Sequence, residues 1–249
     1  MNLTIVADEN MEAVAETMGE LGSVHLLNGR ELQRRHLREA DVLLVRSVTQ
    51  VNEALLESTP VRFVGTATSG FDHIDRVYLR QKEIAFSHAP GSNANSVVEY
   101  VLGAIALVDD KLEQLFAGGS VGIIGYGNIG RLLASRLSGL GITHKIYDPW
   151  LDKKQLCEPA SLAEVLACDV ITLHADLTHQ EPFASFHLLA EAELSSISAN
   201  SLLINASRGD VIDNRALEKL LGAVHAPTVI LDVWEGEPSV SEGLLSKVQ

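Results

Sequence analysis

Short apolar runs alternate with amphipathic stretches along the first part of the chain. The apolar runs lie at residues 3–7, 42–45, 62–66 and, more weakly, 84–87. The amphipathic stretches lie near residues 11–21, 31–40 and 52–58. Strands that are covered on both faces are continuously apolar, so this alternation predicts a parallel sheet with helices on both of its faces.

The same rhythm returns from residue 120 onward. A strand is predicted at 120–124 and a helix at 129–140, where apolar residues recur with the spacing of one helical face. Further strands are predicted at residues 145–147, 170–173, 201–205 and 228–233. Helices fit between them at residues 161–167, 191–197 and 214–221. The chain is therefore predicted to be an α/β protein with two doubly wound units.

The segment between the two units has a different pattern. Residues 93–107 form one unbroken helical pattern that could bridge two domains, and residues 109–119 are acidic and end in two glycines. We therefore predict a first domain at 1–93, an interdomain helix and linker at 94–119, and a second domain at 120–249.

A glycine-rich motif joins the first strand of the second unit to its first helix. Gly125 would allow a tight turn, Gly127 would let a pyrophosphate approach the backbone, and Gly130 would let helix and strand pack closely. Asn128 and Ile129 open the helix, whose N-terminal N–H groups favour phosphate. The motif lies between a strand and a helix, the context that makes it specific for a dinucleotide.

Asp148 ends the next strand, 18 residues after Gly130. A carboxylate at this position can accept hydrogen bonds from ribose hydroxyls and would repel the extra phosphate of NADP. No arginine adjoins Asp148 in the sequence, so the predicted cofactor is NAD. The alternative is an ordinary strand-to-helix turn in which Asp148 acts only as a cap.

Composition and charge narrow the classes of partner. The net charge of −14 argues against nucleic acid and anionic membranes, which need a basic face. No apolar stretch is long enough to span a membrane, and the first residues do not resemble a signal peptide. The two cysteines, Cys157 and Cys168, are interpreted as reduced thiols of a cytoplasmic protein. The sequence predicts no metal site.

Four segments resemble the D-isomer-specific 2-hydroxyacid dehydrogenases. They are residues 64–75, 93–100, 202–213 and 231–238, and they span most of the chain in the family's order. The resemblance implies a flavodoxin-like substrate domain, an NAD-binding Rossmann domain and a homodimer for the full-length protein. The implied activity is oxidation of a D-2-hydroxy acid by NAD.

The resemblance also implies roles for single residues. Arg208 follows a strand and matches the catalytic arginine, whose guanidinium can hold a carboxylate with two hydrogen bonds. Glu237 matches the acid that holds the family's catalytic histidine, and Glu235 is the less favoured alternative. The further cofactor contacts implied are Ala175, Asn205, Ala206, Ser207 and Asp232.

A second cluster suits a phosphorylated substrate. Arg46, Ser47 and Thr49 follow a predicted strand and offer one cation and two hydroxyls, which favour an anion. Thr68 follows another strand and could add a hydroxyl. Residues 45–52 also resemble one branch of the family that acts on a phosphorylated hydroxy acid. Ordinary strand-to-helix loops are rich in serine and threonine too, so a structural role remains the alternative.

The sequence departs from the family at its catalytic histidine. None of the nine histidines matches that motif; His73, His174 and His225 lie elsewhere in the pattern. The chain therefore resembles a family member that is truncated at its C-terminus, with an incomplete second domain, and we expect these 249 residues to bind NAD weakly and to turn over slowly. The alternatives are another dehydrogenase of the family, acting on phosphoglycerate, glyoxylate or hydroxypyruvate, and a non-catalytic NAD-binding module.

Overall fold

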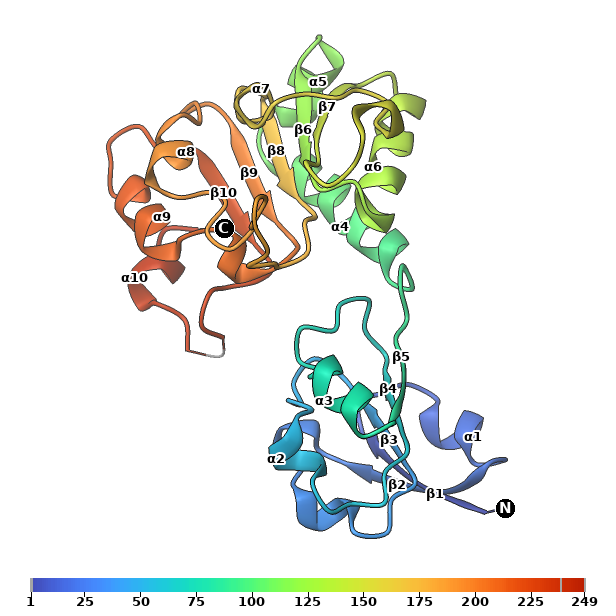
Figure 1. Ribbon diagram of the computed structural model, residues 1–249. Coiled ribbons are helices and arrows are strands. Elements are labelled where there is room, and N and C mark those ends of the chain that lie inside the picture. The colour runs from blue at the N-terminus through green and yellow to red at the C-terminus, as the bar shows by residue number, and fades with distance from the viewer. Residues whose placement is uncertain (1, 238, 249) are drawn as a thin grey trace. The chain divides into compact units, whose positions relative to one another are not determined.

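The chain folds into two compact units, Met1–Asn93 and Ala94–Gln249, each with its own sheet (Figure 1). The computed structural model describes residues 2–237 and 239–248. Pro238, the last residue of the motif at 231–238, lies outside the described residues. Within the described residues, no helix is both long enough and apolar enough to cross a membrane.

The first unit is built on five parallel strands. They are β1 Leu3–Asp8, β2 Gly22–Leu27, β3 Val42–Val45, β4 Phe63–Thr66 and β5 Ala85–Ser87. Their spatial order, β2-β1-β3-β4-β5, is that of flavodoxin-like sheets, which confirms the predicted fold class of this unit. Its helices are α1 Val14–Met18, α2 Glu53–Leu56 and α3 Arg76–Gln81.

Two elements of the first unit differ from the sequence prediction. β2 was not predicted, because this edge strand is half exposed and lacks a continuous apolar run. The helix predicted at 31–40 is wrong: two short 3₁₀ turns, η1 Gly29–Glu31 and η2 Arg34–Leu37, replace it. Leu32 and Gln33 are extended between the turns, so the buried Leu37 reaches the core without a continuous helix.

The second unit also has five parallel strands. They are β6 Ser120–Ile124, β7 Thr143–Tyr147, β8 Val170–Leu173, β9 Leu202–Asn205 and β10 Thr228–Leu231, in the order β10-β9-β8-β6-β7. A single parallel bridge between Ile146 and Pro159 adds one residue of a further strand beside β7. With that residue, the sheet approaches the Rossmann order, in which the direction of strand addition reverses at the first strand.

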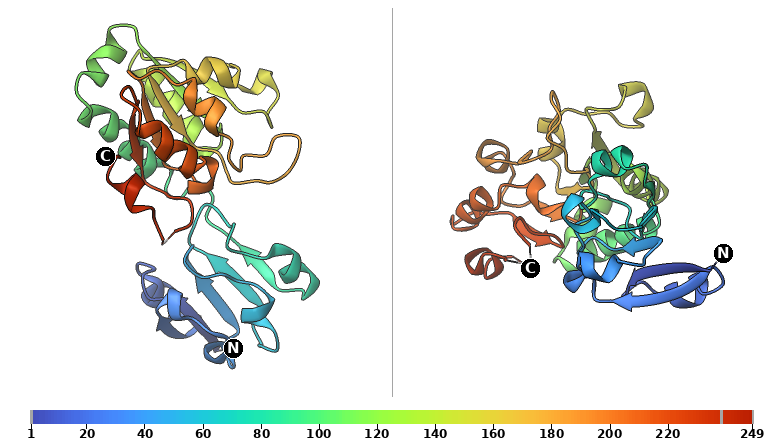
Figure 2. Two further views of the ribbon diagram at one scale, coloured as in Figure 1. Left: turned by 90° about the vertical axis from the view of Figure 1, so that its left-hand side faces the viewer. Right: turned by 60° about the horizontal axis from the view of Figure 1, so that its bottom comes forward.

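Helices cover both faces of the second sheet (Figures 1 and 2). One apolar core contains side chains of α4 Ala94–Leu107, α5 Lys111–Phe116 and α6 Asn128–Gly139. The other contains side chains of α7 Leu162–Leu166, α8 Glu191–Ser195, α9 Asn214–Leu221 and α10 Glu242–Leu245. Two further 3₁₀ turns are η3 Lys153–Gln155 and η4 Gly209–Val211. The doubly wound architecture predicted for this unit is confirmed.

The predicted linker is wrong, because its residues are part of the second unit. α5 occupies residues that were interpreted as an acidic connection, and Leu115 is 2% exposed in the same core as Val101 of α4. Lys111 is also buried, and its ammonium group donates to the carbonyl of Asn200 and to Gln114. The acidic residues of segment 109–119 favoured a linker, although a few apolar side chains fix α5 to the core.

Helix starts follow the capping chemistry of the sequence. Ser161 caps α7 and forms a capping box with Glu164, and Asp213 caps α9 by accepting from the backbone N–H groups of Arg215 and Ala216. The predicted helix at 214–221 is therefore confirmed to the residue.

Candidate active site

The strands of the second sheet end together. Tyr147, Ile124, Leu173, Asn205 and Leu231 are register partners from one strand to the next, so they form one row across the carboxyl edge of the sheet. The residues just beyond this row are the predicted site residues Asp148, Gly125, Ala206 and Asp232, together with His174. The register thus brings residues that are distant in the sequence to one edge.

A cleft of about 520 Å³ opens at this edge, where the strand order reverses between β6 and β8. Ligands of doubly wound sheets bind at such a switch point. The walls of the cleft come from the glycine loop, from the segment after β7, which includes Asp148 and Trp150, and from the segment after β8, which includes Ala175.

The three glycines of the loop serve different purposes. Gly125 has a φ of 95°, and a Cβ on it would lie 2.6 Å from the backbone nitrogen of Ala175. A Cβ on Gly130 would overlap the carbonyl of Gly125. A Cβ on Gly127 would meet nothing within 4 Å, although Gly127 lines the cleft. The space beside Gly127 is therefore open to a ligand, as a pyrophosphate requires.

The N-terminus of α6 faces the same cleft. Gly127 is its N-cap and provides no side-chain acceptor for the first N–H groups of the helix, and Asn128, the first helical residue, lines the cleft. Uncapped N–H groups and the positive end of a twelve-residue helix dipole favour an anionic group. These residues fit the pyrophosphate of a dinucleotide.

Asp148 is held in place by backbone groups. One carboxylate oxygen accepts from the backbone N–H of Tyr126 at 2.8 Å, and the other accepts from that of Trp150 at 3.1 Å. Each oxygen keeps further acceptor capacity for a ribose hydroxyl. The charge of Asp148 also raises the pKa of Tyr147, although burial of the phenol is the larger cause.

Arg131 was not predicted as a site residue. It lies far from Asp148 along the chain and lines the cleft from the first turns of α6. Its guanidinium lies 4.5 Å from the ring centre of Tyr126, a cation–π contact. The signal was present in the sequence, because helix periodicity places the residue after Gly130 near the start of α6.

His174 also lines the cleft, and its side chain is buried. Its Nε2 is 3.0 Å from the hydroxyl of Thr172, and its buried Nδ1 has no hydrogen-bond partner within the described part of the chain. Burial lowers the pKa of His174 from 6.5 to about 4. The imidazole is therefore neutral at pH 7 and is a weaker base than an ordinary histidine.

Arg208 lies in a loop that its neighbours hold rigidly after β9. The Asn205 side chain donates to the carbonyl of Arg208 at 2.9 Å and accepts from the backbone and the hydroxyl of Ser207. The Arg208 guanidinium donates to the Ser207 carbonyl at 2.8 Å. Asn205 and Ser207 are buried, and their side chains hold the shape of the loop.

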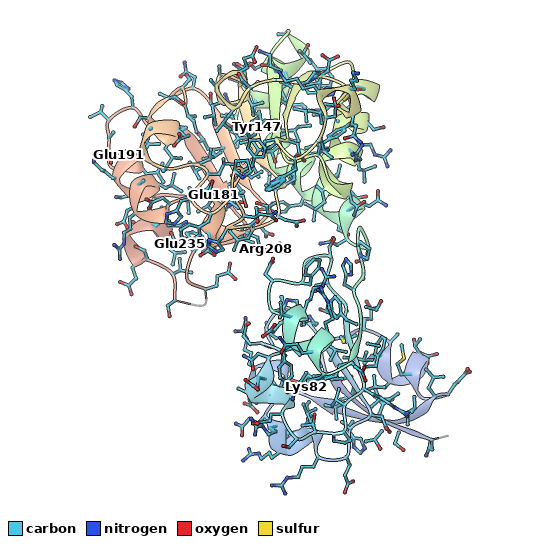
Figure 3. The ribbon with its side chains drawn as sticks, in the orientation of Figure 1. Lys82, Tyr147, Glu181, Glu191, Arg208 and Glu235 are labelled. Carbon is cyan, nitrogen blue, oxygen red and sulfur yellow. The ribbon has the colours of Figure 1, made fainter. Side chains whose placement is uncertain are left out.

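Glu235 and Glu237 have different surroundings. Glu235, labelled with Arg208 in Figure 3, lies 2.8 Å from Nε2 of His187 and accepts from the backbone N–H of Asn214. Glu237 is exposed, and one of its oxygens accepts from the backbone N–H of Trp234 at 2.7 Å. No histidine in the described residues hydrogen bonds to Glu237, so this chain does not present the family's acid–histidine pair among them.

Gly209 lets the Arg208 loop pack closely against the segment after β10. A Cβ on Gly209 would overlap the backbone of Trp234 and Glu235, so a side chain there would separate the Arg208 loop from the 232–237 segment. Asp232 donates its backbone N–H to Asn205 at 3.0 Å and is exposed. Its charge contributes to the raised pKa of Tyr100, after burial as the first cause.

The substrate residues predicted in the first unit are only partly available. Ser47 is exposed and Arg46 half-buried after β3. Thr49 is 4% exposed and donates its hydroxyl to the carbonyl of Gly29, so the prediction that its hydroxyl binds substrate conflicts with the structure. The hydroxyl of Thr68 donates to the carbonyl of Gly70 and pairs with that of Thr66, so it too is engaged inside the loop.

Residues 107–249 match the family described as D-isomer specific 2-hydroxyacid dehydrogenase, NAD binding domain. The chain belongs to this family. It therefore carries an NAD-binding domain, and the predicted cofactor, NAD, is confirmed.

Curated relatives agree with this assignment, and a solved structure shares the fold. Erythronate-4-phosphate dehydrogenase of Cellvibrio japonicus is 49% identical over 99% of this chain and 64% of its own length. The enzyme of that name from Marinobacter nauticus is 45% identical over 99% and 65%. The chain thus spans slightly less than two thirds of these curated relatives. D-lactate dehydrogenase from Aquifex aeolicus, solved with NAD and lactic acid, is 24% identical with a TM-score of 0.80, covers 97% of this chain and 83% of its own, and shares the fold.

Proposed function

We propose that this chain belongs to an enzyme that oxidises 4-phospho-D-erythronate to (R)-3-hydroxy-2-oxo-4-phosphooxybutanoate with NAD. The observation that carries this proposal is the register row, because it gathers the glycine loop, Asp148, the Arg208 loop and Asp232 at one sheet edge. The substrate is suggested by the relatives named erythronate-4-phosphate dehydrogenase. The proposal includes a cytoplasmic homodimer that serves pyridoxal 5'-phosphate biosynthesis.

Different residues of the second unit would bind NAD, bind the hydroxy acid and orient the base. NAD supplies the hydride acceptor when it is bound. The N-terminus of α6 would hold the pyrophosphate and Asp148 the adenosine ribose, which fixes the cofactor along the cleft. The guanidinium of Arg208 would hold the substrate carboxylate and the carbonyl oxygen that forms as the hydroxy acid is oxidised. Glu237 would orient the base that takes the hydroxyl proton.

We also propose a phosphate-binding role for residues of the first unit. Arg46 and the exposed Ser47 are the best donors there, since the hydroxyls of Thr49 and Thr68 are engaged internally. An arginine can bind phosphate through two parallel hydrogen bonds. Arg46→Lys should weaken the binding of a phosphorylated substrate without changing the affinity for NAD.

Cofactor binding is tested by calorimetric titration of NAD into Gly127→Ala. The added methyl group enters open space, so the fold should be retained while the pyrophosphate is displaced and affinity for NAD falls by about tenfold or more. Gly139→Ala, at the end of α6 and also without a neighbour within 4 Å, is the matched control. Equal affinity in wild type and Gly127→Ala would contradict the placement of the pyrophosphate.

Substrate and turnover are tested separately by NADH formation. 4-Phospho-D-erythronate should react faster than D-3-phosphoglycerate, and a preference for the latter or for glyoxylate-type substrates would assign the chain to another branch of the family. Because no described histidine accompanies Glu237, we expect turnover about 10²–10⁴-fold below that of a curated relative. NAD binding without any turnover would favour the non-catalytic NAD-binding module.

A further inference from the structure

Three side chains of different segments converge beside the Arg208 loop. His187 precedes α8, Asp213 caps α9, and Glu235 follows β10. One possible ligand atom from each lies within 4.8 Å of the other two, and Nε2 of His187 is 2.8 Å from Oε1 of Glu235. The geometry points to a binding site for a divalent transition-metal ion of the zinc class at these three residues, independent of the dinucleotide site.

The donor set suits such an ion. Imidazole nitrogen and carboxylate oxygen are both zinc ligands, at about 2.0–2.2 Å, which places neighbouring ligand atoms about 3.4 Å apart in a tetrahedron. The three ligand atoms lie within 4.8 Å of one another and the His187–Glu235 pair is 2.8 Å apart, so small rotations of the side chains would admit an ion. The ion would take the place of the hydrogen bond between His187 and Glu235, and water would complete the coordination.

Charge also favours a dication. The two carboxylates carry two negative charges, and the only ion pair that the described residues form within this trio is that between His187 and Glu235. The N-terminus of α9 opposes a cation with a partial charge of about +0.5, which two full carboxylate charges outweigh. The side chains of His187 and Glu235 are 29% and 28% exposed, which leaves access for an ion and a water ligand.

The protein backbone holds the three ligands in position. Glu235 accepts from the backbone N–H of Asn214 with its second oxygen, and Asp213 accepts from two N–H groups of α9 through one oxygen. The backbone N–H of His187 donates to the carbonyl of Asp210 at 2.8 Å, and the φ of His187 is 50°, an uncommon value for a residue other than glycine. Outer hydrogen bonds of this kind orient metal ligands.

The direct test is calorimetric titration of ZnCl₂ into protein that has been dialysed against EDTA. We expect one zinc ion per chain, an increase in thermal midpoint, and visible absorption bands when Co²⁺ is the probe. Mg²⁺ should not compete, because it prefers an all-oxygen octahedral shell.

Three conservative variants remove one ligand each. Asp213→Asn retains the helix cap, Glu235→Gln retains the acceptor for Asn214, and His187→Gln removes the imidazole. Each should weaken zinc binding by about tenfold or more. His225→Gln, which removes an exposed histidine of the same unit, is the matched control and should bind as the wild type does.

Two outcomes would overturn the proposal. Absence of zinc binding by the wild type would show that His187 and Glu235 form an ion pair only. Zinc binding that persists unchanged in all three variants would place the ion on other surface groups. Circular dichroism of each variant reports on the fold, and NAD titration reports on the dinucleotide cleft, which none of the three ligands lines, so failure of the metal site is distinguishable from failure of the proposed function.

Discussion

Gly125→Ala should destabilise the second unit by about 3 kcal/mol. A φ of 95° costs a residue with a side chain about 1–3 kcal/mol. The new Cβ would lie 2.6 Å from the backbone nitrogen of Ala175 and 2.7 Å from the carbonyl group of His174, so the end of β8 must move by about 0.8 Å to reach ordinary contact. Overpacking of this kind typically adds about 1–3 kcal/mol.

The assay is urea unfolding followed by tryptophan fluorescence. The chain has two tryptophans, Trp150 and Trp234, and both lie in the second unit, so the signal reports on that unit alone. For a unit of this size, the expected loss corresponds to a decrease in thermal midpoint of about 10 °C. NAD affinity should fall as well, because the displaced strand end lines the cofactor cleft.

Gly127→Ala provides the internal comparison, since it adds the same methyl group two residues away. Its φ is −78° and its Cβ would meet no atom within 4 Å, so its unfolding free energy should change by less than about 1 kcal/mol. The reasoning would be refuted if Gly125→Ala unfolded within about 1 kcal/mol of the wild type, or if the two variants lost equal stability.

Three further predictions concern the same edge of the sheet. Asp148→Asn retains an acceptor for Tyr126 but removes the charge that repels the extra phosphate of NADP, so the ratio of NADP to NAD affinity should rise by about tenfold; an unchanged ratio in parallel titrations would mean that Asp148 does not select the cofactor. The pKa of His174 is lowered to about 4 from 6.5, so the unfolded state binds more protons between these values, and stability should fall as the pH drops from 6.5 to 4, by about 3 kcal/mol in total. His174→Gln should flatten that dependence in urea unfolding, whereas equal slopes for both proteins would argue against the buried imidazole as its source. Gly209→Ala should destabilise the second unit by about 3 kcal/mol, because the new Cβ pushes the Arg208 loop away from the 232–237 segment. In protein that turns over substrate, the same change should reduce turnover more than it reduces NAD affinity. Turnover equal to that of the wild type would argue against a coupling between the two segments.

The sequence predicted the elements whose signals are local. β8 has four consecutive buried residues and α9 has an aspartate cap, and both were predicted with the observed bounds. β2 was missed because an edge strand needs no apolar run, and its partner β1 supplies the hydrogen bonds. α5 was missed because it is short and lies among acidic residues, so the few side chains that fix it to the core, such as Leu115, give no long helical pattern.

The candidate site was less predictable, because its chemistry depends on which groups are already engaged. The hydroxyl of Thr49 donates to the carbonyl of Gly29, which lies 20 residues away, and no local sequence pattern predicts that hydrogen bond. Arg131 reaches the cleft from the helix rather than from beside Asp148. The different surroundings of Glu235 and Glu237 arise from His187, a partner 48 residues from Glu235 in the chain. Long-range pairing of this kind requires the fold.

The row of strand ends separates buried residues that the fold needs from the residues that follow them, which can be exchanged. Asn205, Leu173 and Ile124 are each at most 1% exposed, and the residues with proposed functions begin one position later. New specificity could thus be introduced by exchanging the residues after the row, without repacking the interior. A deletion of one residue within β9, by contrast, would rotate Arg208 to the opposite face and move it back along the strand by about 3.3 Å. In this fold, substitutions after the row can modify the proposed reaction, whereas changes in strand length would remove it.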